Sequence, residues 1–251
     1  MNPLLAHLQP YPFERLRQLF AGVTPPTNRS PISLGIGEPK HATPEFIKTA
    51  LIQSLDTALS GYPATLGELR MREACAQWLK RRYAIEVNPA TQILPVNGSR
   101  EALFALAQTV LDPTKPGAKV ISPNPFYQIY EGATLLGGAE PFYVANAPET
   151  DFSANWDAVP DAIWAQTQLV FVCSPGNPTG KVMPLAEWKK LFELSEKYGF
   201  VIASDECYSE IYFREEAPLG GLEAATKLGR TDFKNLVAFT SLSKRSNVPG
   251  M

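Results

Sequence analysis

The amino-acid sequence predicts an α/β fold built on a mostly parallel sheet with helices on both faces. Segments with strand character alternate along the chain with segments of helical periodicity, as in βαβ units. Two of the expected strands, at 168–175 and 200–206, contain short continuous apolar runs, which are typical of strands buried on both faces. A chain of 251 residues is long enough to bury a sizeable core.

The spacing of apolar residues predicts the helices and strands, and the positions of proline and glycine predict where they begin and end. Prolines crowd the first 45 residues, so we expect an extended, partly irregular arm over residues 1–42. Expected helices cover 46–55, 67–83, 101–111, 126–136 and 184–199, the last with proline at its start and glycine at its end. Expected strands cover 92–96, 119–123, 140–145, 168–175, 200–206 and 235–243.

The composition excludes several classes of partner. The chain has 23 Lys and Arg against 25 Asp and Glu, and this net charge of −2 gives no long-range attraction for nucleic acid or an anionic membrane. No apolar stretch approaches the ~18–20 residues that span a bilayer, and the first residues lack the pattern of a signal peptide. The 3 cysteines and 2 histidines do not stand at metal-ligand spacing. We expect a cytoplasmic protein with no metal site.

Polar residues follow the expected strands, where ligands bind in parallel sheets. Residues 97–99 follow the first strand, Asn177 follows the fourth, Asp205 ends the fifth and Lys244 comes just after the last. Burial of Lys244 would favour the neutral amine that a Schiff-base nucleophile needs, although its amine could also simply reach water. Asp205 could pair with a protonated pyridine nitrogen, or it could cap a helix or join a salt bridge in a loop.

The other candidates each have a structural alternative. The segment NGSREA (97–102) places small residues at a helix start, which suits a phosphate but also suits an ordinary helix cap. Asn177 lies in the Gly- and Pro-rich SPGNPTG (174–180), where turns use Asn for structural reasons. Tyr127, in PNPFYQIY (123–130), could stack on a flat ring or pack in the core.

Together with SDECY (204–208) and SLSK (241–244), these motifs occur in an order that resembles the class I and II pyridoxal-phosphate aminotransferases of fold type I. The resemblance extends from residue 34 to residue 251. It implies that residues 43–251 form the cofactor-binding large domain of such an enzyme, with the arm of residues 1–42 in front of it.

The resemblance also implies a role for each motif residue. Lys244 would hold pyridoxal 5′-phosphate covalently and later move the proton at the substrate α-carbon, while Asp205 would pair with the pyridine nitrogen. Asn177 and Tyr208 would hydrogen-bond the phenolic oxygen of the ring. The other residues are expected to stack on the ring (Tyr127), to hold the phosphate (Gly98, Ser99, Arg100 and Ser241), to lie near the substrate carboxylate (Gly37, with Asn177) and to reach the phosphate of the neighbouring subunit (Tyr62).

These roles imply a homodimer with shared sites, acting on amino-acid and 2-oxo-acid substrates. Within the family, PNPFYQIYEGA, FVCSPGNPTG, SDECYSEIYF and SLSKRSNVPGM, with the arm segment LQPYPFERLRQLF, are most similar to bacterial succinyldiaminopimelate transaminases. That similarity implies transfer of an amino group between N-succinyl-LL-2,6-diaminopimelate and 2-oxoglutarate or glutamate in lysine biosynthesis.

The sequence departs from the family pattern after residue 251. Family members continue with an arginine that clamps the phosphate, then with a strand that inserts into the middle of the sheet, and then with a small domain that supplies an arginine for the substrate carboxylate. A sheet without an interior strand leaves unpaired edges and exposed apolar surface. We therefore expect a truncated chain without the C-terminal small domain, poorly stable and weak or inactive in catalysis.

Three alternatives share the same cofactor residues. The chain could be another amino-acid aminotransferase, a pyridoxal-phosphate β-lyase that eliminates a thiol, or an inactive cofactor-binding fragment. A transcriptional regulator of the same fold is disfavoured, because the first 30 residues are too few and not basic enough for a DNA-binding module. Conversion of the cofactor to pyridoxamine phosphate would separate a transaminase from a lyase.

Overall fold

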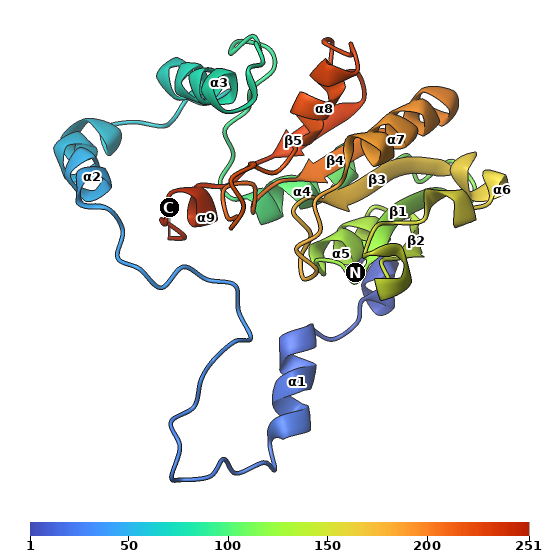
Figure 1. The fold of residues 1–251 in the computed structure, drawn as a ribbon, viewed down its shortest axis with the longest axis horizontal. Coiled ribbons are helices and arrows are strands. Elements are labelled where there is room, and N and C mark those ends of the chain that lie inside the picture. The colour runs from blue at the N-terminus through green and yellow to red at the C-terminus, as the bar shows by residue number, and fades with distance from the viewer. Residues whose placement is uncertain (251) are drawn as a thin grey trace.

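Five parallel strands form one sheet in residues 1–250, the part of the chain that the computed structural model describes (Figure 1). Their order across the sheet is β2-β1-β3-β4-β5, and each neighbouring pair is parallel. The strands are β1 (Lys119–Asn124), β2 (Glu140–Ala145), β3 (Thr167–Cys173), β4 (Val201–Asp205) and β5 (Leu236–Phe239). The expected α/β class is confirmed. Met251, where the expected large domain ends, lies outside the described residues.

Helices cover both faces of this sheet. One face packs against α4 (Ser99–Val110) and α5 (Ile129–Leu136), and the other against α7 (Leu185–Tyr198) and α8 (Gly221–Lys227). Strand β3 is buried on both sides because successive side chains of a strand point to opposite faces. Leu169 and Phe171 belong to the core under α4 and α5. Val170 and Val172 belong to the core under α7 and α8.

The expected helices are all present, and the structure adds shorter ones. The helices expected at 46–55 and 67–83 are α2 (Glu45–Ala58) and α3 (Leu69–Tyr83), and the other three correspond to α4, α5 and α7. Outside the arm, the additional short helices are η2 (Pro148–Thr150), η3 (Trp156–Ala158), α6 (Asp161–Trp164), α8 and α9 (Leu242–Arg245). No helix within residues 1–250 is long and apolar enough to cross a membrane.

Two strand predictions need correction. Residues 92–96 form no strand, since no described segment pairs with them, Pro95 lacks a backbone donor, and Leu94 and Val96 are largely exposed. The final strand ends at Phe239 rather than at residue 243. The Ser241 hydroxyl accepts a hydrogen bond from the Ser243 backbone N–H at 3.1 Å, and this cap turns the chain into α9.

The N-terminal arm leaves the body of the molecule and returns to it near α9 (Figure 1). It is not extended throughout, because it contains η1 (Pro3–His7) and α1 (Pro12–Phe20). Helix α1 begins at a proline, and its apolar residues recur at helical spacing, a signal present in the sequence. None of the residues in η1, α1 or α2 is buried. The boundary at residue 42 stays a prediction.

Candidate active site

The predicted chemical residues gather at the carboxyl end of β4 and β5. Asp205 is the last residue of β4 and pairs in register with Phe239, the last residue of β5. Lys244 follows in α9, with its Nζ atom 5.4 Å from the centre of the Tyr208 ring. The end of β3 joins them, because the Ser174 backbone N–H donates to the Asp205 carbonyl at 3.1 Å. Three adjacent strand ends therefore build one site.

Asp205 is buried and held by two donors. The Tyr130 hydroxyl donates to its Oδ2 atom at 2.8 Å, and the Cys207 backbone N–H donates to its Oδ1 atom at 3.2 Å. Tyr130 is itself 1% exposed and stacks on Phe171 with ring centres 4.6 Å apart. Burial raises the pKa of the Tyr130 hydroxyl well above its usual value, and the neighbouring Cys173 and Asp205 add to the rise. The Tyr130 hydroxyl thus keeps its proton and is a fixed hydrogen-bond donor to the carboxyl.

The sequence analysis did not single out Tyr130, although it lies in the PNPFYQIY motif. Its ring meets that of Tyr127 edge to face, with the centres 5.9 Å apart. The Tyr127 hydroxyl in turn accepts a hydrogen bond from Arg100 Nε at 2.6 Å. The Arg100 side chain therefore orients the tyrosine that is expected to stack on a cofactor, whereas the sequence predicted only a phosphate contact for Arg100.

The start of α4 supplies the expected phosphate cradle. Gly98 is the N-cap residue and has a φ of 103°, a conformation that favours glycine. A Cβ atom there would come within 2.2 Å of the Glu101 carboxylate, so only glycine fits without rearrangement. The Ser99 hydroxyl accepts a hydrogen bond from the Cys207 thiol at 3.4 Å, which ties this helix start to the loop after Asp205. Ser241, also expected to hold the phosphate, is the N-cap residue of α9 and precedes Lys244 by three positions.

Tyr208 and Gly37, which the sequence predicts to lie near the cofactor and the substrate carboxylate, lie close to each other. A Cβ atom on Gly37 would lie 3.1 Å from the Tyr208 hydroxyl, so the arm backbone passes directly over that group. Burial is the main cause of a raised pKa of Tyr208, which keeps its hydroxyl a donor.

Two other predicted residues make no side-chain hydrogen bond to this group. Tyr62 is fully exposed, with a relative accessibility of 102%. The Asn177 backbone lies against the Cys173 thiol, which also contacts Tyr130, but the Asn177 side chain makes no hydrogen bond to the described residues. The structure thus places the Asn177 backbone beside the site and leaves the Tyr62 side chain in solvent.

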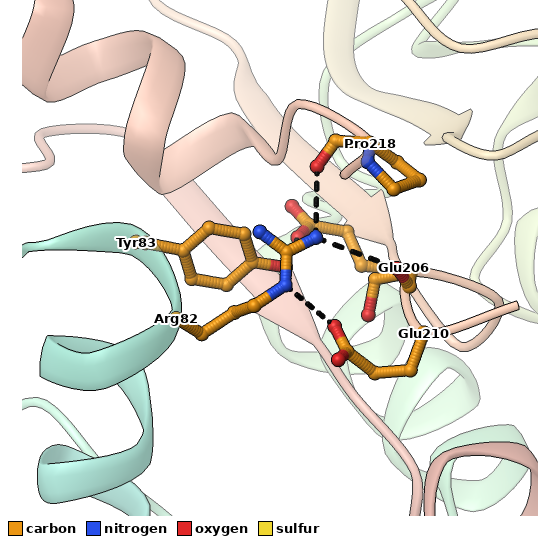
Figure 2. Close-up of polar contacts among 6 residues, drawn as sticks. Arg82, Tyr83, Glu206, Glu210 and Pro218 are labelled. Atoms are coloured by element: carbon orange, nitrogen blue, oxygen red, sulfur yellow. Dashed lines mark hydrogen bonds and ion pairs between the residues drawn. The ribbon is translucent and has the colours of Figure 1, made fainter. Parts of the chain in front are cut away.

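A polar cluster that the sequence did not indicate holds the loop after Asp205 (Figure 2). Glu206 is 2% exposed, and its Oε1 atom accepts hydrogen bonds of 2.8 Å from the Gly221 backbone N–H and from the Ser204 hydroxyl. Its Oε2 atom faces the Tyr83 hydroxyl of α3 at 3.4 Å. Burial raises the pKa of Glu206 to about 7.

Arg82 completes the attachment of α3 to this loop. Its Nε atom pairs with Glu210 at 2.8 Å, and its NH2 group donates to the carbonyl of Pro218 at 3.1 Å (Figure 2). The guanidinium also lies 4.4 Å from the centre of the Tyr83 ring. Because the loop begins next to Asp205 and contains Tyr208, α3 fixes the backbone that carries two of the candidate site residues.

A profile of the family described as "Aminotransferase class I and II" matches residues 29–251. The chain belongs to the class I and II aminotransferase family. Pyridoxal 5′-phosphate is the cofactor of this family. Among the described residues, no group of three His, Cys, Asp or Glu side chains could hold a metal ion.

Solved structures of other aminotransferases have the same fold. An aminotransferase from Neisseria meningitidis is 54% identical, with a TM-score of 0.95 over 100% of this chain and 63% of that chain. The aminotransferase AspB from Helicobacter pylori is 39% identical, with a TM-score of 0.88 over 97% of this chain and 63% of that one. A curated relative from Nitratidesulfovibrio vulgaris strain DP4, named LL-diaminopimelate aminotransferase, is 33% identical over 98% of this chain and 62% of its own length.

The chain therefore spans about three fifths of the length of these relatives. The curated relative's name also differs from the succinyldiaminopimelate transaminases that the motif variants indicated.

The residues of this aminotransferase chain fit the family cofactor. A pyridine nitrogen needs a buried acidic partner, and Asp205 is 5% exposed with its oxygens already oriented by two donors. A phosphate needs free backbone N–H groups at a helix start, and α4 offers them beside a glycine that keeps the approach open. Lys244 would supply the amine, and Tyr127 and Tyr208 would supply aromatic and hydroxyl contacts.

Proposed function

We propose that the chain carries the cofactor site of a transaminase that uses pyridoxal 5′-phosphate. The observation that carries this proposal is the buried Asp205 carboxyl, oriented by the Tyr130 hydroxyl at 2.8 Å on the same sheet edge as Lys244 and Tyr208. An acid placed this way, next to an amine that can form a covalent bond, is what transamination by this cofactor requires.

Each residue then has a defined task. Lys244 holds the cofactor covalently and, once its amine is free, moves the proton at the substrate α-carbon. When bound, pyridoxal phosphate supplies an electron-withdrawing ring that makes this proton easier to remove. Asp205 keeps the ring nitrogen protonated, and Tyr208 and Asn177 hydrogen-bond the phenolic oxygen. The remaining contacts are stacking by Tyr127, phosphate binding by Gly98, Ser99, Arg100 and Ser241, and substrate carboxylate contact near Gly37.

We infer that the amino donor is a diaminopimelate derivative. The motif variants favour N-succinyl-LL-2,6-diaminopimelate, with 2-oxoglutarate as the acceptor and glutamate as the product. Free LL-2,6-diaminopimelate is the second candidate, because several curated relatives of 32 to 34% identity carry the name LL-diaminopimelate aminotransferase. The two compounds differ by one amide-linked succinyl group, so the specificity must be decided by contacts to that group.

We also propose that the active form is a homodimer with shared sites. Tyr62 is fully exposed, and no residue of α1 or α2 is buried, although these helices carry exposed apolar side chains such as Leu19 and Phe46. Such a surface supports association with a second copy, in which Tyr62 would reach the phosphate of the neighbouring site.

The first experiment is covalent trapping on this chain. The purified protein is mixed with pyridoxal phosphate, reduced with borohydride and mapped by mass. We expect a single label on Lys244, no label in Lys244→Ala, and an unchanged label in Lys234→Ala, which removes an exposed lysine. Labels scattered over surface lysines, or no label, would refute the proposal.

The second experiment addresses the reaction and the donor. Each diaminopimelate compound is added to the loaded protein without an acceptor, and formation of pyridoxamine phosphate is followed by absorbance and mass. Faster conversion with the succinylated compound supports our choice, and faster conversion with the free compound favours the second candidate. Absence of pyridoxamine phosphate with both compounds would refute a diaminopimelate donor.

A further inference from the structure

Three hydrogen bonds connect the N-terminal arm to the loop that follows Lys244. The Nδ2 atom of Asn247 donates to the carbonyl oxygens of His41 and Ala42 at 2.8 and 2.9 Å. The Thr43 hydroxyl donates in return to the Asn247 carbonyl at 2.9 Å. More than 200 residues of sequence separate the two sides of this contact.

Asn247 is well suited to this position. Its φ is 54°, in the left-handed region, which asparagine adopts more readily than most residues. Both hydrogens of its side-chain amide are used, so one side chain satisfies two carbonyl groups of a segment without regular structure. The next residue, Val248, is 6% exposed and anchors the loop in the body of the molecule.

Both ends of the arm segment 37–43 lie close to residues of the candidate site or to the loop after Lys244, but only residues 41–43 are hydrogen-bonded there. At one end Gly37 passes over the Tyr208 hydroxyl. At the other end residues 41–43 bond to Asn247, three positions after Lys244. Before Gly37 the chain runs without helix or strand from the end of α1, so its path depends on these contacts.

We propose that Asn247 is a positioning residue, a latch that holds segment 37–43 across the Tyr208 and Lys244 side of the site. By fixing this segment it sets the place of Gly37, where the substrate carboxylate is expected. The latch itself consists of hydrogen bonds within this chain, and only its link to substrate binding rests on the proposed function.

Trypsin cleavage tests the latch without any need for turnover. The bond after Lys40 lies inside the latched segment, and the bond after Arg29 lies outside it and serves as an internal reference. Replacing Asn247 with glycine keeps the left-handed backbone accessible and removes only the two side-chain bonds. We expect the rate at Lys40 relative to Arg29 to rise about tenfold, because cleavage follows the population of the opened segment and two hydrogen bonds are lost.

The matched control is Asn235→Gly. Asn235 also has a left-handed φ, of 58°, but its side chain makes no hydrogen bond to the described residues. We expect this variant to leave the Lys40 to Arg29 ratio unchanged. Thr43→Val, which removes only the third bond, should raise the ratio by a smaller factor. Equal ratios in the two asparagine variants would overturn the latch.

A binding measurement tests the positioning role. Glutarate, the dicarboxylate skeleton of 2-oxoglutarate, is titrated into the pyridoxal-phosphate-loaded protein and followed by the cofactor absorbance. In Asn247→Gly we expect the Kd of glutarate to rise about tenfold while the spectrum of the loaded protein stays unchanged. If Asn247→Gly speeds trypsin cleavage after Lys40 but leaves the Kd of glutarate unchanged, the positioning role is overturned. If borohydride traps no pyridoxal phosphate on Lys244 of the wild-type chain, the proposed function fails. The ratio of trypsin cleavage after Lys40 to cleavage after Arg29 still tests the latch in that case.

Discussion

Glu206 should make the stability of this chain depend on pH near neutrality. Its carboxyl is 2% exposed, and burial raises its pKa from 4.5 to about 7. The fold therefore favours the protonated form. Its contribution to stability is fully present below about pH 4.5 and is lost as the pH rises through about 7. Since one pK unit corresponds to about 1.36 kcal/mol, the full loss is about 3 kcal/mol.

Glu206→Gln isolates this contribution. Glutamine is neutral at every pH, and its amide oxygen can still accept from the Gly221 N–H and the Ser204 hydroxyl, the two bonds of 2.8 Å. The free energy of unfolding of the variant should therefore not show the decrease with rising pH that the buried Glu206 carboxyl causes in the wild type. Of the expected difference, about 2.5 kcal/mol should develop between pH 5 and pH 8, with the variant the more stable at pH 8.

The assay is urea unfolding of both proteins at half-unit pH steps from 5 to 8. Glu216→Gln serves as the control, because Glu216 is exposed and the same substitution there removes no buried carboxyl. Its free energy of unfolding should run parallel to that of the wild type. Parallel curves for wild type and Glu206→Gln would show that Glu206 does not change protonation over this range, and would refute the reasoning.

Four further substitutions test local features by urea unfolding at pH 7. Tyr130→Phe removes the buried donor to Asp205 and should lower the free energy of unfolding by about 1.5–3 kcal/mol, the range for a hydrogen bond to a charged group. Gly98→Ala forces a Cβ onto a backbone with φ of 103° and should cost about 1–2 kcal/mol. Ala84→Gly should stabilise by about 1 kcal/mol, because Ala84 ends α3 with φ of 55°, whereas Ala74→Gly in the exposed interior of that helix should destabilise by about 1 kcal/mol. Equal effects of the two alanine changes would contradict the last expectation.

The local pattern of apolar residues was sufficient to predict most strands of the sheet. The apolar run at 168–175 predicted a strand buried on both faces, and β3 has this burial because its alternate side chains reach different helix layers. The same reasoning placed Asp205 at a strand end and Lys244 just beyond another. These features depend on periodicity and on the direction of parallel strands, which a sequence carries by itself.

Strand pairing and side-chain contacts between distant segments could not be predicted from the local sequence pattern. Residues 92–96 have the composition of a strand, but a strand exists only with a hydrogen-bonded neighbour, and no local pattern reports whether one is present. Tyr130 likewise looks like a packing aromatic, and its function as a donor depends on a carboxyl 75 residues away in sequence. Asn247 binds residues 41–43 across an even longer separation. Each of these was missed because the decisive partner is distant in sequence.

The adjacent carboxyls of Asp205 and Glu206 show how one strand end can serve two purposes. Their side chains enter opposite layers: Asp205 contacts Tyr130, from the core under α4 and α5, whereas Glu206 contacts the start of α8 on the other face. Asp205 accepts hydrogen bonds from two donors, and burial raises the pKa of Glu206 to about 7. The charge on Asp205 itself contributes to that rise. A carboxyl that protonates near neutrality limits the repulsion between the pair, while its hydrogen bonds to Gly221 and Tyr83 hold the backbone that presents Asp205 to the site.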